Sequence, residues 1–408
     1  MNQEPPLEPA SIHAGHSERR PVVALLVAHW EAKSEEGWIT RQVAGALACV
    51  ADVHVVTPDG NVPGTSVDSV FTLHRLATPI DPLAEIRRDL LVEGVSASFR
   101  IRETGTPDGL EELIDEELID PWSGASNVLS GLQPDLVVVV GHQNRGALVA
   151  LDRADPGAAP TLVALGSDPD SVAFPLYDDI VQRSSSVLAV TETERVSIVE
   201  SHGIEGKVHR IGAPLVANPS VLGEPNTWVG ANDTIMVLTG VAVGSDHEET
   251  ELSRLLRLRF PDNPVGIVHT DAFDAWHQGR LNRGWAVERS SDLARLMAWA
   301  RVTVDLRPGR LFARRCVDSL LYGTPIVVPH DSRAREHAER GRGGLWFASP
   351  GELTWCVDAL LEPSTHDAFA DQGRRYAEAE YGSTDQFIHR VVGGCGLASD
   401  ATPARITA

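Results

Sequence analysis

Apolar and polar residues alternate along the chain in blocks that predict strands followed by helices. Val22–Ala28 is a continuous run of β-branched and aliphatic residues, as expected for a strand buried on both faces. Gly37–Val50 then carries apolar residues at helical spacing, and Asp52–Thr57 is a second strand closed by the turn Pro58-Asp59-Gly60. Repeated alternation of this kind predicts α/β domains with parallel, doubly wound sheets.

The alternation continues through both halves of the chain. In the first half it predicts the strands Phe71–Leu76, Asp135–Val140, Thr161–Leu165, Ser186–Val190 and Val208–Ile211, and the helices Leu83–Leu91, Arg145–Leu151 and Thr193–His202. In the second half it restarts with Thr234–Thr239, Glu249–Leu258, Val265–Thr270, Leu293–Ala300, Val302–Leu306, Leu311–Tyr322, Pro325–Val328, Gly344–Phe347 and Leu353–Leu361.

A stretch rich in Pro, Gly and Asn separates the two halves. We therefore predict a disordered tail (1–19), an N-terminal Rossmann-like domain (20–218), a linker (219–232), a C-terminal Rossmann-like domain (233–382), and a C-terminal helix and tail (383–408). Ligands of such sheets bind outside the carboxyl ends of the strands, so the cleft between the two domains is the expected site.

Composition and charge narrow the possible partners. Apolar residues make up 42% and charged residues 23% of the 408 residues, and the formal net charge is −22. A chain this acidic repels DNA and anionic lipid, so no nucleic-acid partner is expected. The four cysteines are widely spaced, no apolar run has the length of a membrane span, and the N-terminus lacks an apolar signal segment. We expect a cytoplasmic protein without an integral membrane segment or a metal site.

Three stretches carry a recognisable pattern. They are Ser186–Arg195 with His202-Gly203-Ile204 and Val208–Gly212, then Ala300–Pro308 with Asp318–Val328, and finally Glu36-Gly37 after the first strand. Together they resemble the last βαβ unit of the N-terminal domain, the donor-binding signature and the glycine loop of GT-B glycosyltransferases of the group 1 (family 4) type. The block Gly323-Thr324-Pro325 is the most specific part of this resemblance, which spans roughly Pro21 to Tyr381.

The resemblance implies a GT-B fold with an N-terminal acceptor domain and a C-terminal donor domain. It implies transfer of a sugar from a nucleotide-sugar donor to an acceptor, a small molecule or a glycan. It further implies that no metal or other cofactor is needed, and that the anomeric configuration is retained. In such a mechanism, the leaving diphosphate helps to deprotonate the acceptor on the same face of the sugar.

The sequence departs from that family where the donor diphosphate is bound. Two glutamates eight positions apart frame the family's donor helix; here the first falls on Arg310 and the second on Asp318. The family's clamp of one Arg and one Lys is absent, because the corresponding strand ends in Gly240-Val241 and the chain has only two lysines, Lys33 and Lys207.

Arginines after the predicted strand Val302–Leu306 are the candidates to replace that clamp. A helix starting near Gly309–Leu311, and including Phe312, would aim its free N–H groups at a phosphate. Arg307 and Arg310 are predicted to grip the diphosphate, because a guanidinium binds phosphate through two N–H groups. The alternatives are an arginine in solvent or one paired with an acid such as Asp305.

Three further residues are predicted to contact the donor. Asp318 would accept hydrogen bonds from the ribose hydroxyls, unless it forms a salt bridge with Arg314 on its own helix. Thr324 would touch the donor through its hydroxyl or N–H, although its block equally fits a helix stop. Gly37 would let backbone N–H groups approach phosphate, although a glycine at a helix start is also a common structural choice.

His142, just beyond the strand Asp135–Val140, is the candidate catalytic residue. It would orient an acceptor hydroxyl or relay its proton, and the alternative is a polar or capping histidine in a loop. Asp168-Pro169-Asp170 spells a D-x-D motif but fits a turn better than a metal site. Trp30 and Trp38 are candidates to stack on an acceptor sugar, whereas Trp299 and Trp355 are expected to pack in the core.

Two alternatives to a glycosyltransferase stay open. The departures at Val241 and Arg310, and the absence of a clamp lysine, also fit a GT-B-shaped binding or partner protein that has lost catalysis. Another enzyme on the same fold, such as a nucleotide-sugar epimerase or a transferase with a monophosphate-type donor, is the third possibility.

Overall fold

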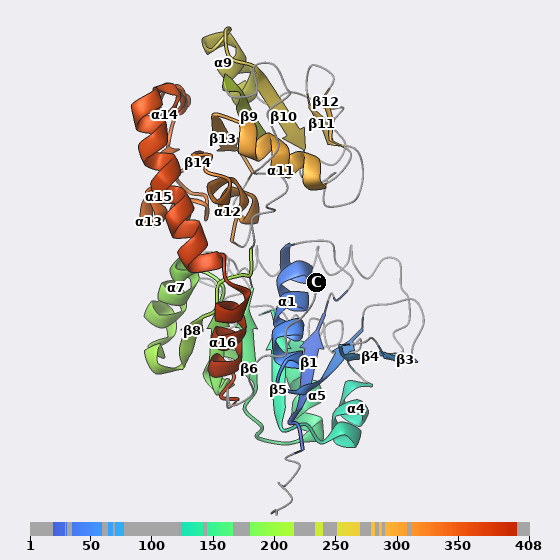
Figure 1. Cartoon of the computed structure of the whole chain (residues 1–408). Helices are drawn as coiled ribbons and strands as arrows, with labels where there is room; N and C mark the ends of the chain where they lie inside the picture. The colour runs from blue at the N-terminus through green and yellow to red at the C-terminus, as the bar shows by residue number, and fades with distance from the viewer. Residues whose placement is uncertain are drawn as a thin grey trace, which may run out of the picture.

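Two mainly parallel sheets follow one another along the chain. The computed structural model describes residues 19–28, 30, 35–58, 64–67, 70–76, 122, 124–141, 145–165, 180–215, 233–239, 251–269, 279–281, 285–287, 290–307 and 312–397. Figure 1 shows the two sheets with their helices one above the other, joined on one side by α15 and α16.

The first sheet has eight strands among the described residues. These are β1 (Val22–Val27), β2 (Asp52–Thr57), β3 (Gly64–Val67), β4 (Thr72–Arg75), β5 (Leu136–Val140), β6 (Thr161–Ala164), β7 (Ser186–Ala189) and β8 (Val208–Arg210). Their order is β3-β4-β2-β1-β5-β6-β7-β8, and within this sheet β3 alone is antiparallel to its neighbour. β1 lies in the middle, with Val23 opposite Val53 of β2 and Leu136 of β5.

Helices cover both faces of this sheet because alternate residues of β1 point to opposite sides. They are α1 (Glu35–Ala48), α4 (Ala125–Leu132), α5 (Arg145–Ala154) and α7 (Glu192–His202). Val23 and Leu25 share a core cluster with Ile39 and Val43 of α1. The intervening residues of β1 pack in a second cluster with α4, α5 and α7, which makes the sheet doubly wound.

The second sheet is five-stranded in the described part of the chain and entirely parallel, in the order β10-β9-β13-β14-β15. Its strands are β9 (Ile235–Thr239), β10 (Val265–His269), β13 (Val302–Asp305), β14 (Ile326–Pro329) and β15 (Gly344–Phe347). Its helices are α9 (Glu251–Arg259), α11 (Ser290–Trp299), α12 (Arg314–Leu321), α13 (Arg335–Gly341) and α14 (Pro350–Leu361). A short antiparallel pair, β11 (Gly279–Leu281) and β12 (Trp285–Val287), forms a separate two-stranded sheet beside β10 and α11.

The last two helices return the chain to the first sheet. α15 (Pro363–Tyr381) packs on α12 to α14, and α16 (Thr384–Gly394) packs on α1, β7 and β8. The hydroxyl of Ser186 donates to the carbonyl oxygen of Gly394 at 2.6 Å. The N–H of Leu215 donates to the carbonyl oxygen of Tyr381 at 2.9 Å. One core cluster consequently runs without a break from β1 and α1 into α12, α13, α15 and α16.

The expected architecture of two parallel, doubly wound sheets is confirmed, with corrections to single elements. The helix expected to start near Gly309–Leu311 begins at Arg314, because Ala313 has a left-handed backbone with φ 53°. α4, α13, α15 and the strands β3, β11 and β12 were not predicted. Trp299 is buried as expected, but the prediction for Trp355 is wrong, since 65% of its surface is exposed.

Several predicted segments lie outside the described residues: the tail 1–18, the linker 219–232, the helix Leu83–Leu91 and the turn Asp168-Pro169-Asp170. The domain boundaries remain predictions. Among the described helices, none has the length and apolar character needed to cross a membrane.

Candidate functional site

The starts of α1 and α12 meet where the two sheets face each other. Trp38, in the first turn of α1, stacks on Phe312 with ring centroids 6.2 Å apart and 17° between the ring planes. The guanidinium of Arg314, the first residue of α12, lies 4.2 Å from the centroid of the same Trp38 ring. Since α1 follows the carboxyl end of β1 and α12 follows that of β13, these contacts join the carboxyl edges of the two sheets.

The backbone at the start of α12 has an unusual conformation. Ala313, the residue before the helix, has φ 53° and ψ 52°, and its side chain cannot cap the helix. A left-handed residue other than glycine costs free energy and persists only where its surroundings hold it. Phe312 beside it is fully buried, in contact with Trp38 and Tyr381. Packing against both domains therefore holds this segment in place.

Arg307 is bound to an acid at the end of β13. Its Nε and Nη2 atoms donate to the two carboxylate oxygens of Asp305 at 2.8 and 2.6 Å. Asp305 is only 3% exposed, and the Sγ of Cys316 also donates to it at 3.2 Å. This is the pairing that the sequence left open as the alternative to a phosphate contact.

Asp318 is bound by arginines of its own helix. Its Oδ2 atom lies 3.3 Å from Nη1 of Arg315 and 3.6 Å from Nε of Arg314. The salt bridge to Arg314 is the alternative that the sequence left open to a contact with the ribose. Two arginines in the first turn of a helix face its positive dipole end, and Asp318 offsets part of that repulsion.

Thr324 and Gly37 are both buried. The Thr324 hydroxyl donates to the carbonyl oxygens of Met297 and Ala300. The N–H of Thr324 donates to the carbonyl oxygen of Ser319 at 3.0 Å. The N–H bond closes the end of α12, as the helix-stop alternative expects, and the hydroxyl bonds join that turn to the end of α11. Gly37 lies one residue before Trp38 in α1, so the structure brings it to the same meeting point as Phe312.

The remaining predicted site residues, His142, Arg310 and Leu311, lie outside the described residues. Trp30 is buried edge-on against Phe71, with ring centroids 5.0 Å apart. In the part of the chain that is described, no group of three or more His, Cys, Asp or Glu residues is placed to hold a metal ion.

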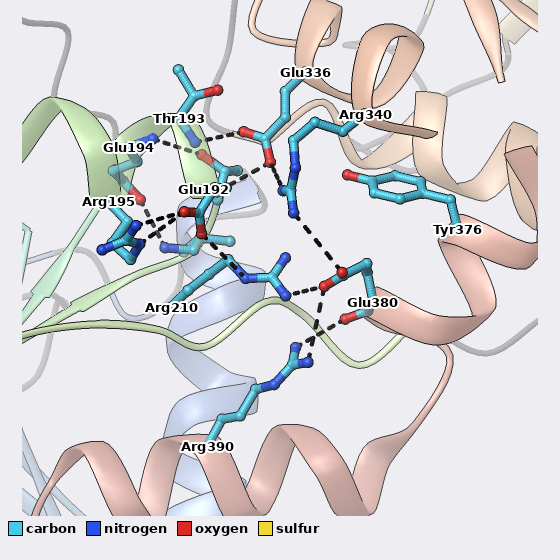
Figure 2. A network of polar contacts seen from close by, with 12 residues as sticks. Glu192, Thr193, Glu194, Arg195, Arg210, Glu336, Arg340, Tyr376, Glu380 and Arg390 are labelled. Carbon is cyan, nitrogen blue, oxygen red and sulfur yellow. Dashed lines mark hydrogen bonds and ion pairs between the residues drawn. The ribbon is translucent and has the colours of Figure 1, made fainter. Parts of the chain in front are cut away.

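A network of ion pairs lies beside this meeting point and joins α7, β8, α13, α15 and α16 (Figure 2). Its centre is Glu380, which lies close to Arg210, Arg340 and Arg390. Arg210 also lies 3.7 Å from Glu192. The arginines come from both halves of the chain, so the network fixes the end of α15 against the first sheet.

Glu336 of α13 caps a helix of the other domain. Its carboxylate accepts the N–H groups of Glu192 and Thr193 at 3.1 and 2.8 Å, while the N–H of Glu194 donates to the Thr191 side chain. Arg340 donates to the same carboxylate at 2.7 Å. Burial alone would raise the pKa of Glu336, but the electrostatic effect of the neighbouring His337 and the hydrogen bonds from Thr193 and Arg340 outweigh burial and lower it. The N-terminus of α7 is therefore already occupied by an anion of the chain itself.

Sequence reasoning missed Glu336 and its neighbour His337. His337 is fully buried, and its two ring nitrogens lie 2.6 Å from the Phe312 carbonyl oxygen and 3.1 Å from the Tyr376 hydroxyl. No local motif marks the roles of these residues, because the N–H groups of α7 that Glu336 binds and the Phe312 and Tyr376 groups that His337 binds lie far away along the chain.

Known proteins share this architecture at low sequence identity. No protein-family model matches the chain, and no curated protein matches it in sequence. The sucrose-phosphate synthase from Thermosynechococcus elongatus has 14% identity and a TM-score of 0.62, over 91% of this chain and 97% of that one. The Anabaena protein HepE, in complex with UDP and glucose, has 12% identity and a TM-score of 0.61, over 92% of this chain and 99% of its own.

A third structure, of a trehalose-6-phosphate synthase studied for glycosyl transfer with retention, has 10% identity and a TM-score of 0.62, over 92% of this chain and 98% of its own. The likeness establishes a GT-B fold over nearly the whole chain, as the resemblance implied. Membership of family 4 finds no support in these comparisons.

Proposed function

We propose that this chain is a glycosyltransferase that moves a sugar from a nucleotide-activated donor to an acceptor. The contact of Trp38 with Phe312 and Arg314 carries the proposal, because it places the first turns of α1 and α12 together between the sheets. Helix N-termini offer N–H donors and a positive dipole end to an anion. At this place they would stabilise the negative charge that develops on a leaving diphosphate.

The structural neighbours support this choice of donor. HepE is described in complex with UDP and glucose, and two further neighbours are sugar-phosphate synthases. By analogy, we propose that the donor diphosphate lies between Gly37 and the segment from Arg310 to Phe312. Asp318 then accepts hydrogen bonds from the ribose, and His142 orients or deprotonates an acceptor hydroxyl.

We further propose that the reaction retains the anomeric configuration and needs no metal. The neighbouring trehalose-6-phosphate synthase is described as transferring with retention. Arginine and helix N–H groups would take the place of a cation at the diphosphate, since both bind phosphate oxygens directly.

A second candidate function is a binding or partner protein on the same fold. The bidentate pairing of Arg307 with Asp305 favours it, because this guanidinium already has a counter-charge. The absence of a lysine at the clamp points in the same direction.

Thermal unfolding in the presence of UDP, GDP or ADP separates the two candidates. A ligand present at a hundred times its Kd stabilises the fold by about 2.7 kcal/mol, which raises Tm by several degrees. A glycosyltransferase should respond to at least one nucleoside diphosphate, and a response to none favours the binding protein.

Arg310→Ala then locates the ligand. This variant should abolish the rise in Tm, whereas the matched variant Arg335→Ala, at an exposed arginine paired with Glu339, should keep it. An unchanged rise in Arg310→Ala would place the anion elsewhere.

A further inference from the structure

The hydrogen bonds of His337 define which of its ring nitrogens carries the proton. A carbonyl oxygen only accepts, so Nε2–H must donate to the carbonyl of Phe312 at 2.6 Å. In the neutral ring Nδ1 is then bare, and it accepts the O–H of Tyr376 at 3.1 Å. Each ring nitrogen of the buried imidazole thus has one hydrogen-bond partner: an acceptor for Nε2–H and a donor for Nδ1.

The surroundings keep both side chains in these protonation states. Burial lowers the pKa of His337, so the ring is neutral at pH 7. Burial likewise raises the pKa of Tyr376 to about 12, so its hydroxyl keeps the proton that it donates. The rings of Phe312 and Tyr381 pack edge-on against the imidazole, with centroids 6.5 and 5.6 Å away, and define its orientation.

The carbonyl that His337 binds belongs to the peptide that precedes the left-handed residue Ala313. The carbonyl of Ala313 in turn accepts the N–H of Cys316 at 2.8 Å in the first turn of α12. Rotation of the Phe312–Ala313 peptide would therefore change the direction of the first N–H groups of the helix. Local sequence does not favour this conformation, because alanine rarely adopts a positive φ.

We propose that His337, oriented by Tyr376, is a positioning residue that holds the start of α12 in the geometry that binds the donor diphosphate. The contribution of His337 to diphosphate binding rests on the donor site proposed above. Its hydrogen bond to the Phe312 carbonyl, which holds the backbone, does not depend on that site. His337 lies next to Glu336, which caps α7 of the other domain, so one turn of α13 binds the helix start and the facing domain together.

Two variants of His337 separate a hold on the backbone from simple filling of space. His337→Leu fills a similar volume but leaves the Phe312 carbonyl without a donor, and His337→Gln keeps a side-chain N–H for it. Leu129→Ala, in the core of the first sheet, serves as the control for lost stability. Hydrogen exchange of the α12 amides is measured relative to those of β9, together with the Kd of the nucleoside diphosphate that raises Tm most.

His337→Leu should speed exchange in α12 about tenfold relative to β9 and raise Kd about tenfold, while His337→Gln stays near the wild type in both. Leu129→Ala should lower Tm without changing the exchange ratio of α12 or Kd. Unchanged relative exchange of α12 in His337→Leu overturns the proposal. If the wild type binds no nucleoside diphosphate, the proposed function fails, and the exchange ratios still decide whether His337 holds the helix start.

Nitrogen NMR of ¹⁵N-histidine in the wild-type protein gives a test that needs no variant of His337. A neutral ring protonated at Nε2 is expected, with the Nδ1 signal perturbed in Tyr376→Phe. A ring protonated at Nδ1 would contradict the assigned hydrogen bonds and overturn the proposal.

Discussion

The guanidinium of Arg314 lies 4.2 Å from the ring centroid of Trp38, although the two residues belong to different sheet domains. Phe312 stacks on the same indole, so one side chain of α1 contacts two residues at the start of α12. Cation–π and stacking contacts of this kind contribute about 0.5–2 kcal/mol each. The relative position of the two helix N-termini thus depends on a small number of side chains around Trp38.

Replacing Trp38 by Leu should weaken the junction between the domains. We expect a loss of about 2 kcal/mol in the free energy of unfolding, because the stack on Phe312 and the contact with Arg314 disappear. Denaturant unfolding measures the loss, and nucleoside diphosphate affinity should fall with it. The control is Trp355→Leu at an exposed tryptophan, which should change neither quantity. Equal stability of the two variants would mean that Trp38 does not join the domains.

Glu336→Gln should loosen the cap on α7. The variant keeps the shape but loses the charge that faces the helix dipole and Arg340, at a cost of about 1–2 kcal/mol. The folded pKa of Glu336 lies below its ordinary value of 4.5, so its stabilising effect is present above that pH and lost as the pH falls further. The stability difference between wild type and variant should therefore shrink below pH 4.5.

Glu339→Gln is the matched control for this comparison, because Glu339 pairs with Arg335 at the surface of the same helix. It should cost less than about 0.5 kcal/mol at any pH. A loss as small in Glu336→Gln would rule out the interdomain cap as a stabilising contact.

Stability should also fall as the pH drops from 7 to 5. Burial lowers the folded pKa of His337 below its ordinary value of 6.5, so the unfolded chain takes up the proton first and is favoured at lower pH. One such group changes the free energy of unfolding by at most about 1.4 kcal/mol per pH unit.

The variant His337→Gln assigns this pH dependence. It should reduce the slope of unfolding free energy against pH between 7 and 5, but not abolish it, since burial lowers the pKa of His54 and His74 as well. Identical slopes in wild type and variant would show that His337 does not titrate in this range.

The buried pair of Asp305 and Arg307 should show strong coupling. Removing one partner leaves the other charge buried, so Arg307→Leu or Asp305→Asn alone should each cost about 3 kcal/mol or more. The double variant should lose much less than the sum of the two single losses. A simple sum in urea unfolding would indicate that Arg307 does not depend on Asp305.

Sequence patterns predicted most of the elements that lie in the two sheets. β1 is recognisable because it is buried on both faces and therefore apolar throughout. α15 escaped prediction because a glycine makes its closest contact with the rest of the domain: a Cβ on Gly373 would lie 2.8 Å from Leu320 and 2.9 Å from the Cα of Gly343. The glycine interrupts the apolar stripe of the helix, which otherwise includes Ala377 and Tyr381.

The site was predictable only in part, since its contacts join residues far apart in the chain. Spacing alone suggested Asp305 for an arginine partner and Arg314 for Asp318, because these pairs are local. The pairing of Trp38 with Phe312, and of His337 with the Phe312 carbonyl, follows from how two domains pack together. A single sequence carries no periodic signal for such contacts.

The most direct test of the whole account is hydrogen exchange of the wild-type protein with and without the nucleoside diphosphate that stabilises it most. We predict slower exchange in the first turns of α1 and α12, around Trp38 and Arg314, and little change in α4, α9 and α14. Protection confined to other elements, or no protection by any nucleoside diphosphate, would contradict a donor site where these two helices meet.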